Sequence, residues 1–159
     1  MNARTLRTNG QPGPHLSDFM FLGSLAGQFE DLQQFLHMAV LTARQSFGAA
    51  EGFMVVSLDD EPCITMTSDA PQSAAFVRLA APYWPAALAA ADPILVLRTL
   101  SGDVPGRGLP TLVTLYSDNV PVGILGLFGA SPTQPAEASA VGHFLGQAVT
   151  NFRLFHEAR

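Results

Sequence analysis

The chain of 159 residues contains no lysine, because all eight of its basic residues are arginines. This absence excludes Schiff-base chemistry and the lysine-dependent phosphate sites of Walker-type proteins and kinases. A single cysteine, Cys63, excludes an internal disulfide and a multi-cysteine zinc site. A formal net charge of −5 argues against a nucleic-acid partner, since such proteins concentrate basic charge on one surface.

Charged residues are also scarce, at 13% of the chain, whereas 48% of the residues are hydrophobic. The longest apolar runs, such as Val122 to Phe128, are far shorter than the roughly 20 residues of a membrane helix. No apolar signal-peptide segment follows Met1 to Gly13. We therefore expect a cytoplasmic protein with no membrane insertion, made of a disordered leader over 1–15 and one compact domain over 16–159.

Periodic apolar residues predict a long helix at each end of this domain. The first is expected to begin near Ser17 or Asp18 and to run without a break to Gly48, a natural C-terminal residue for a helix. Its apolar residues recur every three or four positions on one face, at Leu25, Phe29, Leu32, Leu36, Ala39, Ala43 and Phe47. The last helix is expected to begin near Thr133 and to bury Val141, Leu145, Ala148, Phe152 and Phe155.

Between these helices, the sequence predicts hairpins and short helices. Strands are expected at 52–58, 63–67, 94–100, 111–116 and 122–128. Ser117-Asp118-Asn119 joins the last two strands, because these residue types tolerate positive φ. The stretch 71–91 reads as two short helices broken near Pro82. This order predicts an α+β domain with a central antiparallel sheet of five to six strands.

Three passages resemble the GAF domain, a sensory relative of the PAS fold. Residues 111–128 are similar to the family's late hairpin, in which a turn precedes a strand of the form Gly-x-Leu-Gly. Residues 131–140 resemble the entry into the family's final helix, and 151–159 resemble the helix that leads into an output module. The resemblance spans 17–159. It implies a strand order 2-1-5-4-3, with the terminal helices on one face of the sheet and the short helices over a pocket on the other.

Two glycines of the expected strand 122–128 leave alternatives open. Gly123 and Gly126 have opposite parity, so they remove side chains from opposite faces of the strand. Both positions are compatible with tight packing of a helix on the sheet. Alternatively, one of them leaves room for a ligand or for a packed side chain.

If the fold is that of a GAF domain, a set of polar and aromatic residues is expected near the pocket. Arg98 interrupts an apolar strand and either pairs with an anionic ligand or extends to water. Trp84 is either a core residue or a ligand contact. The predicted pocket residues are Arg78, Tyr83, Trp84, Arg98, Thr114 and Tyr116.

The terminal helices carry apolar residues on their outer sides, which suggests a homodimer. The residues expected in that interface are Met20, Met38, Leu41, His143 and Leu154. We therefore expect a non-catalytic sensory or regulatory GAF domain that binds a small molecule and acts on a downstream kinase or cyclase module. The alternative is a roadblock- or longin-like interaction adaptor without a pocket.

No enzyme active site can be assembled from the remaining residues. The four histidines, His15, His37, His143 and His156, show no metal-binding spacing, and no metal site is expected. Cys63 has no neighbouring histidine and is expected to be an inert thiol, which excludes the multi-cysteine cycle of methionine-sulfoxide reductases of this family. The bilin-binding and cyclic-nucleotide-binding signatures are also absent. The sequence names no cofactor.

Overall fold

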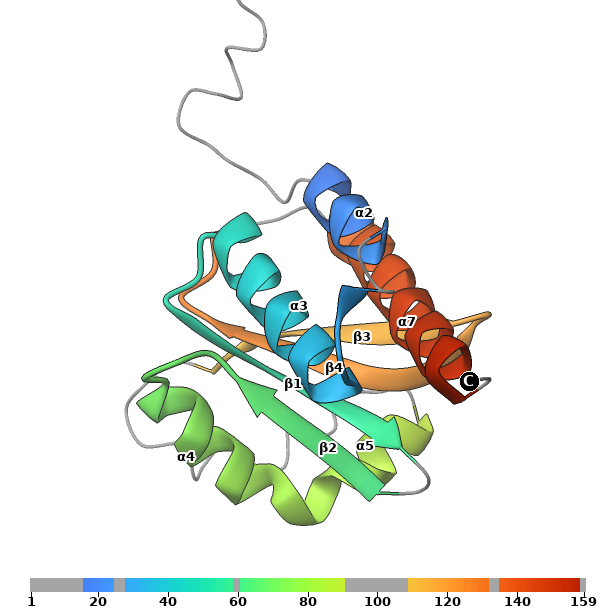
Figure 1. Ribbon diagram of the computed structural model, residues 1–159. Helices are drawn as coiled ribbons and strands as arrows, with labels where there is room; N and C mark the ends of the chain where they lie inside the picture. The colour runs from blue at the N-terminus through green and yellow to red at the C-terminus, as the bar shows by residue number, and fades with distance from the viewer. Residues whose placement is uncertain (1–15, 25–27, 59–60, 91–108, 132–134, 158–159) are drawn as a thin grey trace, which may run out of the picture.

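The computed structural model of the chain describes residues 16–24, 28–58, 61–90, 109–131 and 135–157. An antiparallel sheet lies between two layers of helices (Figure 1). The predicted leader 1–15 and the predicted strand 94–100 lie outside the described residues.

The described part of the sheet has four strands in the order β2-β1-β4-β3. These strands are β1 (Glu51–Leu58), β2 (Glu61–Met66), β3 (Thr111–Ser117) and β4 (Val120–Phe128). The order agrees with the 2-1-5-4 part of the expected arrangement. The described residues therefore contain four of the five to six predicted strands.

The β3–β4 hairpin turns at two residues with positive φ, Asp118 at 51° and Asn119 at 67°. This turn matches the right-handed twist of the strands, and it confirms the sequence interpretation of this segment. The pairing of the two strands shifts between Leu115 and Tyr116. Such an irregularity changes the direction in which the following side chains point.

The predicted continuous N-terminal helix is wrong, because two helices are present: α2 (Leu16–Ser24) and α3 (Leu32–Ser46). Asp31 is the N-cap residue of α3, and its Oδ1 accepts a hydrogen bond of 2.8 Å from the backbone N–H of Gln34. The Oε1 of Gln34 accepts one of 2.7 Å from the N–H of Glu30. This paired capping is a helix-start signal that the apolar periodicity hid. The expected end of the helix is confirmed, since Gly48 follows α3 with φ 66°.

The helix α7 (Pro135–Glu157) lies against β3, the edge strand of the described sheet (Figure 1). Four of its five predicted core residues are buried, and the side chain of Phe155 lies outside the described residues. Gly142 faces the carbonyl oxygen of Thr114 and Gly146 faces the backbone of Tyr116, so that an added Cβ at either glycine would overlap the strand. The two glycines therefore set the close approach of α7 to β3.

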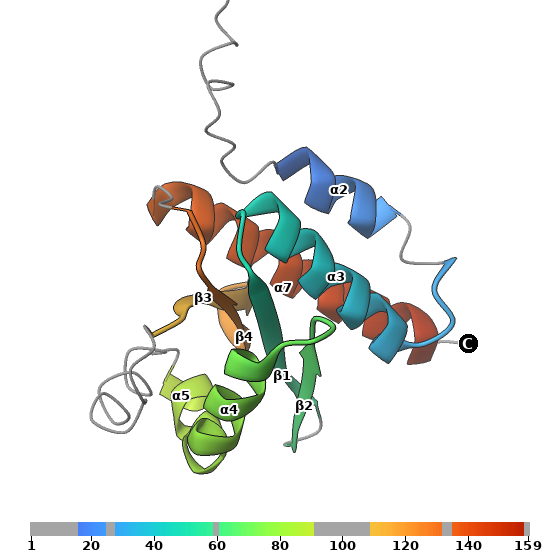
Figure 2. The ribbon, with the colours of Figure 1, turned by 90° about the vertical axis from the view of Figure 1, so that its left-hand side faces the viewer.

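Two short helices and a connecting turn cover the other face of the sheet (Figure 2). They are α4 (Pro71–Ala80), the 3-10 turn η2 (Ala81–Tyr83) and α5 (Trp84–Ala90), which confirms the predicted break near Pro82.

Alternation along β1 divides the core into two layers. Met54 and Val56 pack toward α2, α3 and α7, whereas Phe53 and Val55 pack toward α4 and α5. These four side chains are almost wholly buried, as expected for a strand covered on both faces.

Candidate functional site

Aromatic rings fill the face of the sheet under α4 and α5. The ring of Phe53 lies 5.8 Å from that of Phe76 and 5.9 Å from that of Trp84, measured between centroids. Phe76 lies 6.2 Å from Trp84 and 6.1 Å from Phe128. Edge-on and tilted pairs at these distances are favourable. This aromatic layer occupies the place where the sequence predicts a pocket.

Gly126 makes room for this layer. A Cβ at this position would overlap the ring of Phe53, its cross-strand partner on β1. At Gly123, the nearest atoms belong to Val55 on β1 and Leu115 on β3. The expectation that helices pack closely at both glycines is therefore wrong, and a packed side chain takes the space at Gly126. The close helix contacts lie instead at the two glycines of α7.

Two polar atoms are buried on the α4–α5 side without a hydrogen-bond partner among the described residues: Trp84 Nε1 and Ser73 Oγ. Both residues are fully buried. Leaving a buried donor unpaired costs about 1–3 kcal/mol, and such groups usually find a protein, water or ligand partner. Among the predicted pocket residues, Trp84 is therefore the one whose buried N–H needs a hydrogen-bond acceptor that the described residues do not provide.

Of the other predicted pocket residues, Tyr83 packs against the same aromatic cluster as Trp84. Arg78 is exposed on α4, Tyr83 is half-buried in η2, and Thr114 is half-buried on β3. Arg98 lies outside the described residues.

Tyr116 lies with α7 instead of with Trp84. Its ring stacks on that of His143 at 4.7 Å and 20°, and the next residue, Ser117, donates a hydrogen bond of 3.4 Å to Gln147 Oε1 on the same helix. The shift in strand pairing before Tyr116 explains why it does not share the environment of Thr114.

A buried carboxylate that the sequence analysis missed anchors α4 to β1. The Oε1 of Glu51 accepts a hydrogen bond of 2.6 Å from the N–H of Ser73, and its Oε2 accepts weaker ones from the backbone and side chain of Gln72. Glu51 is only 5% exposed. Because α4 has no side-chain cap of its own, Glu51 supplies both the hydrogen bonds and the negative charge that a helix N-terminus favours.

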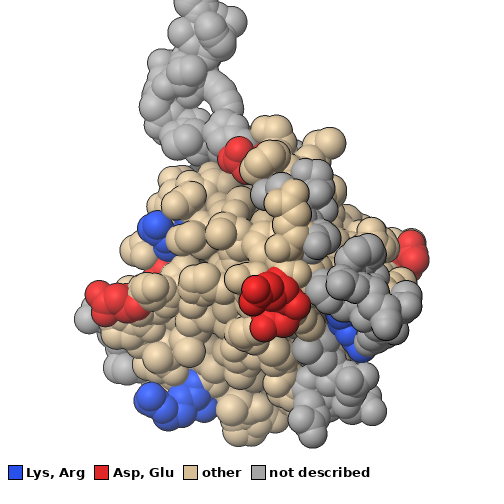
Figure 3. Space-filling view, in the orientation of Figure 1, with Lys and Arg blue, Asp and Glu red and all other residues tan. Residues whose placement is uncertain are grey.

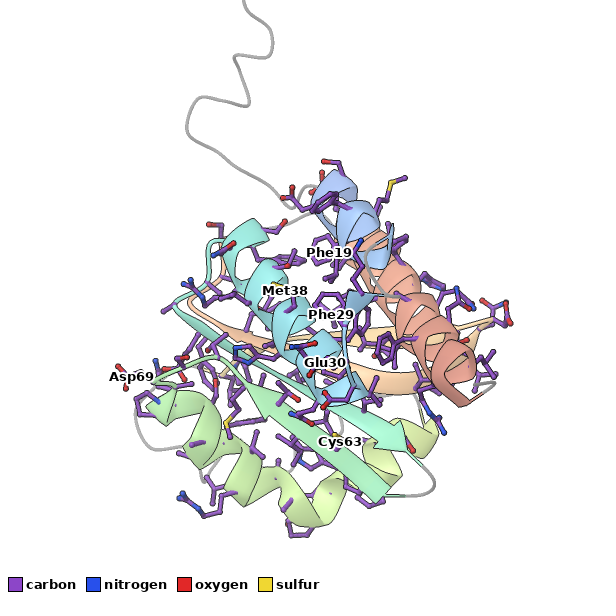
Figure 4. The ribbon with its side chains drawn as sticks, in the orientation of Figure 1. Phe19, Phe29, Glu30, Met38, Cys63 and Asp69 are labelled. Carbon is purple, nitrogen blue, oxygen red and sulfur yellow. The ribbon has the colours of Figure 1, made fainter. Side chains whose placement is uncertain are left out.

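The predicted interface residues fall into two groups. Met20 is 55% exposed on α2, Leu154 is 59% exposed on α7, and His143 is exposed on α7. Met38, 38% exposed, lines a groove between α2 and α3 (Figure 4). Leu41 is half-buried and lines a smaller cleft of about 300 Å³ between α3 and the segment after β2.

Cys63 is held in a polar contact on β2, close to α3. Its Sγ donates to Gln33 Oε1 at 3.4 Å, and Gln33 Nε2 donates to Thr65 Oγ1 at 2.8 Å. Burial raises the pKa of the Cys63 thiol above its ordinary value. The environment therefore favours the protonated thiol, which is the less reactive form.

Among the described residues, no three His, Cys, Asp or Glu side chains lie close enough to hold a metal ion. No helix in the described part of the chain has the length and apolar character needed to cross a bilayer.

No known family profile and no curated protein matches the sequence. A solved structure with a similar fold is described as the GAF domain of a sensor histidine kinase from Pseudomonas syringae pv. tomato. It aligns with a TM-score of 0.56 at 12% sequence identity, over 98% of this chain and 96% of that chain. The resemblance seen in the sequence is therefore confirmed at the level of the fold, and this chain has a GAF-like fold.

Proposed function

We propose that this chain is a non-catalytic sensory or regulatory domain of the GAF type, which acts in the cytoplasm on a downstream kinase or cyclase module. The observation that carries the proposal is the GAF-like fold across nearly the whole chain, similar to a domain described as part of a sensor histidine kinase. The helices α2, α3 and α7 form one continuous layer, which suits a domain that passes a signal by a shift in helix packing (Figure 1).

The proposed domain forms a homodimer through the outer sides of α2 and α7. Met20 and Leu154 expose more than half of their surface, and His143 is exposed on α7. In Figure 3, acidic side chains lie over the start of α2 and over the start of α3, where Figure 4 labels Glu30, and much of the surface between these patches is uncharged. Apolar surface of this kind marks interaction sites on otherwise polar proteins. We do not include Met38 and Leu41 in the proposed interface, because they line the groove and the cleft described above.

Light scattering at micromolar concentration tests this dimer. The wild-type chain should have twice its monomer mass of 16.9 kDa. Leu154→Glu should give the monomer, because it places a charge in the apolar contact. Val120→Glu is the matched control, since Val120 is 58% exposed at the β3–β4 turn, and it should leave the dimer intact. A wild-type chain that is strictly monomeric would contradict the proposal.

A second candidate function is small-molecule sensing at the α4–α5 face, favoured by the indole N–H of Trp84, which has no hydrogen-bond partner among the described residues. The alternative is an interaction domain without a pocket, favoured by the ring of Phe53 over Gly126. The two are separable because Trp84 is the only tryptophan in the chain. We expect a ligand at this face to change the emission of Trp84 in a screen of cyclic nucleotides, haem, tetrapyrroles and small acids. No change with any of them would favour the pocketless domain.

A further inference from the structure

A groove of about 800 Å³ runs between α2 and α3, on the face of the sheet opposite Trp84. The side chains that line it come from α2, from the segment before α3, and from α3 itself. They are Asp18, Phe21, Leu22, Gln28, Phe29, Gln34, Met38, Thr42, Gln45 and Ser46. Sites for small molecules have volumes of about 300–1,000 Å³, so the groove has the right size for one.

The two helices run antiparallel, so the start of α2 lies beside the end of α3 (Figure 1). The groove between them has polar ends and an apolar middle. Gln34, Met38, Thr42 and Gln45 are spaced by three or four residues, so they form one stripe of α3 that faces α2. Asp18, at the start of α2, lies toward the end of α3 that carries Gln45.

The middle of the groove is lined by apolar side chains from both helices. Phe21 and Leu22 come from α2, and Met38 comes from α3 (Figure 4). Phe29, in the segment before α3, adds a second aromatic ring near the far end. Apolar side chains from both helices thus line the groove between its ends, where amide and hydroxyl groups lie.

Charge restricts what this groove accepts. Among the described residues that line it, Asp18 is the one charged side chain, and none of them is an arginine or a histidine. A phosphate or carboxylate ligand would find no opposite charge there. A protonated amine would find the Asp18 carboxylate, and aromatic rings attract cations as well.

We propose that the α2–α3 groove binds an elongated apolar molecule that carries one protonated amine. The apolar body lies along Phe21, Leu22 and Met38, and the amine lies at Asp18. This site is independent of the proposed dimer contacts at Met20 and Leu154, which do not line the groove.

Three probes that differ only in the head group test the proposal: 4-phenylbutylamine, 4-phenylbutanol and 4-phenylbutyrate. Binding can be followed by NMR of the methionine methyl groups, since the chain has five methionines and Met38→Leu identifies the signal of Met38. We expect the Met38 signal to shift with the amine. The Met66 signal, from a side chain packed toward α4 and α5, should stay in place. The affinity should fall from the amine to the alcohol to the carboxylate.

The role of Asp18 has a matched control. Asp18 and Glu137 are both exposed acidic residues in the first turn of a helix, where the helix dipole alone could explain them. Asp18→Asn should reduce the preference for the amine over the alcohol by about 1.4- to 5-fold, the range of an exposed ion pair. Glu137→Gln should leave that preference unchanged.

Other occupants of the groove would give different results. If Met38 shifts on dilution of the protein but not with any probe, a second copy of the chain occupies the groove. If it shifts on removal of residues 1–15 and not with any probe, the N-terminal segment does. Each of these results, or stronger binding of the carboxylate than of the amine, would overturn the proposal.

Discussion

The two faces of the sheet are packed by different means. Under α4 and α5, four aromatic rings form the core, and Glu51 ties α4 to the sheet. Under α2, α3 and α7, a larger core combines four buried phenylalanines, two of them stacked at 4.9 Å, with a majority of smaller apolar side chains, and two glycines bring α7 onto β3. The outer surface of this second layer carries the groove and the exposed side chains of Met20, Phe21, Met38 and Leu154, whereas α4 exposes Leu79.

This difference indicates which face of the sheet is suited to binding partners and ligands. The aromatic layer closes the α4–α5 face with side chains of the protein itself, and the N–H of Trp84, which has no partner in the described part of the chain, is a candidate ligand contact there. The helical layer offers apolar surface that nothing in the described part of the chain covers at Met20 and Leu154. We therefore expect partners and apolar ligands mainly on the helical layer.

The largest effect is expected from Phe53→Ala, which removes the ring at the centre of the aromatic layer. Phe53 is fully buried and contacts the rings of Phe76 and Trp84. The free energy of unfolding should fall by about 3–5 kcal/mol, as measured by urea denaturation. A loss below about 1 kcal/mol would mean that the layer is loosely packed and leaves space for a ligand.

Gly126→Ala tests how tightly the Phe53 ring packs on β4. The added methyl group overlaps the Phe53 ring, so the free energy of unfolding should fall by about 1–3 kcal/mol. The loss should shrink when Phe53 is replaced by leucine, because the smaller side chain leaves the methyl group room. Strictly additive losses in this double-mutant cycle would show that the two positions are not in contact.

On the other face, Gly146→Ala should destabilise the protein although alanine is the better helix former. The added Cβ would overlap the backbone of Tyr116, which cannot move away without shifting β3. We expect a loss of about 1–3 kcal/mol, against a gain of about 1 kcal/mol from helix propensity alone. Ser139→Ala, at an exposed position of α7, is the control and should change stability little. A stabilised Gly146→Ala would refute the close contact.

Glu51→Gln should loosen α4 without affecting the helical layer. It removes the charge that holds the N–H groups of Gln72 and Ser73, and about 1–2 kcal/mol should be lost. Amide hydrogen exchange should quicken in α4 and remain unchanged in α7. Glu137→Gln removes an exposed carboxylate and should cost less than about 0.5 kcal/mol.

The smallest effect concerns Cys63. Because burial raises the pKa of its thiol, the thiolate fraction at pH 8 should be below that of a free cysteine. Iodoacetamide should therefore react slowly with the folded protein, faster as the pH rises, and faster again in urea. A folded protein that reacts faster than free cysteine at pH 8 would contradict this environment.

Much of the fold could be predicted because its signals are local. Positive-φ residue types fixed the turn at Asp118 and Asn119, and Pro82 marked the break between α4 and α5. The prediction of one continuous N-terminal helix was wrong because the apolar residues of α2 and α3 share the same three- to four-residue spacing. That spacing does not show where one helix ends and the next begins. Asp31 and Gln34 carried the capping signal that would have revealed it.

The site was harder to predict because it depends on contacts between distant residues. Glu51 lies 22 positions before Ser73, and no sequence pattern shows that its carboxylate caps α4. The ring that fills the space at Gly126 comes from another strand. Tyr116 changes its environment through one irregularity in strand pairing. The exposed apolar residues on α2 and α7, by contrast, follow from helical periodicity alone.

The most direct test of the account is a dilution series followed by the methionine methyl signals. Met20 lies on the outer side of α2, whereas Met54 is buried and Met66 packs toward α4 and α5. If the helical layer is the dimer interface, the Met20 signal should move on dilution from millimolar to micromolar protein, and the Met66 signal should not. Movement of Met66 with a stationary Met20 would place the interface on the opposite face and contradict the account.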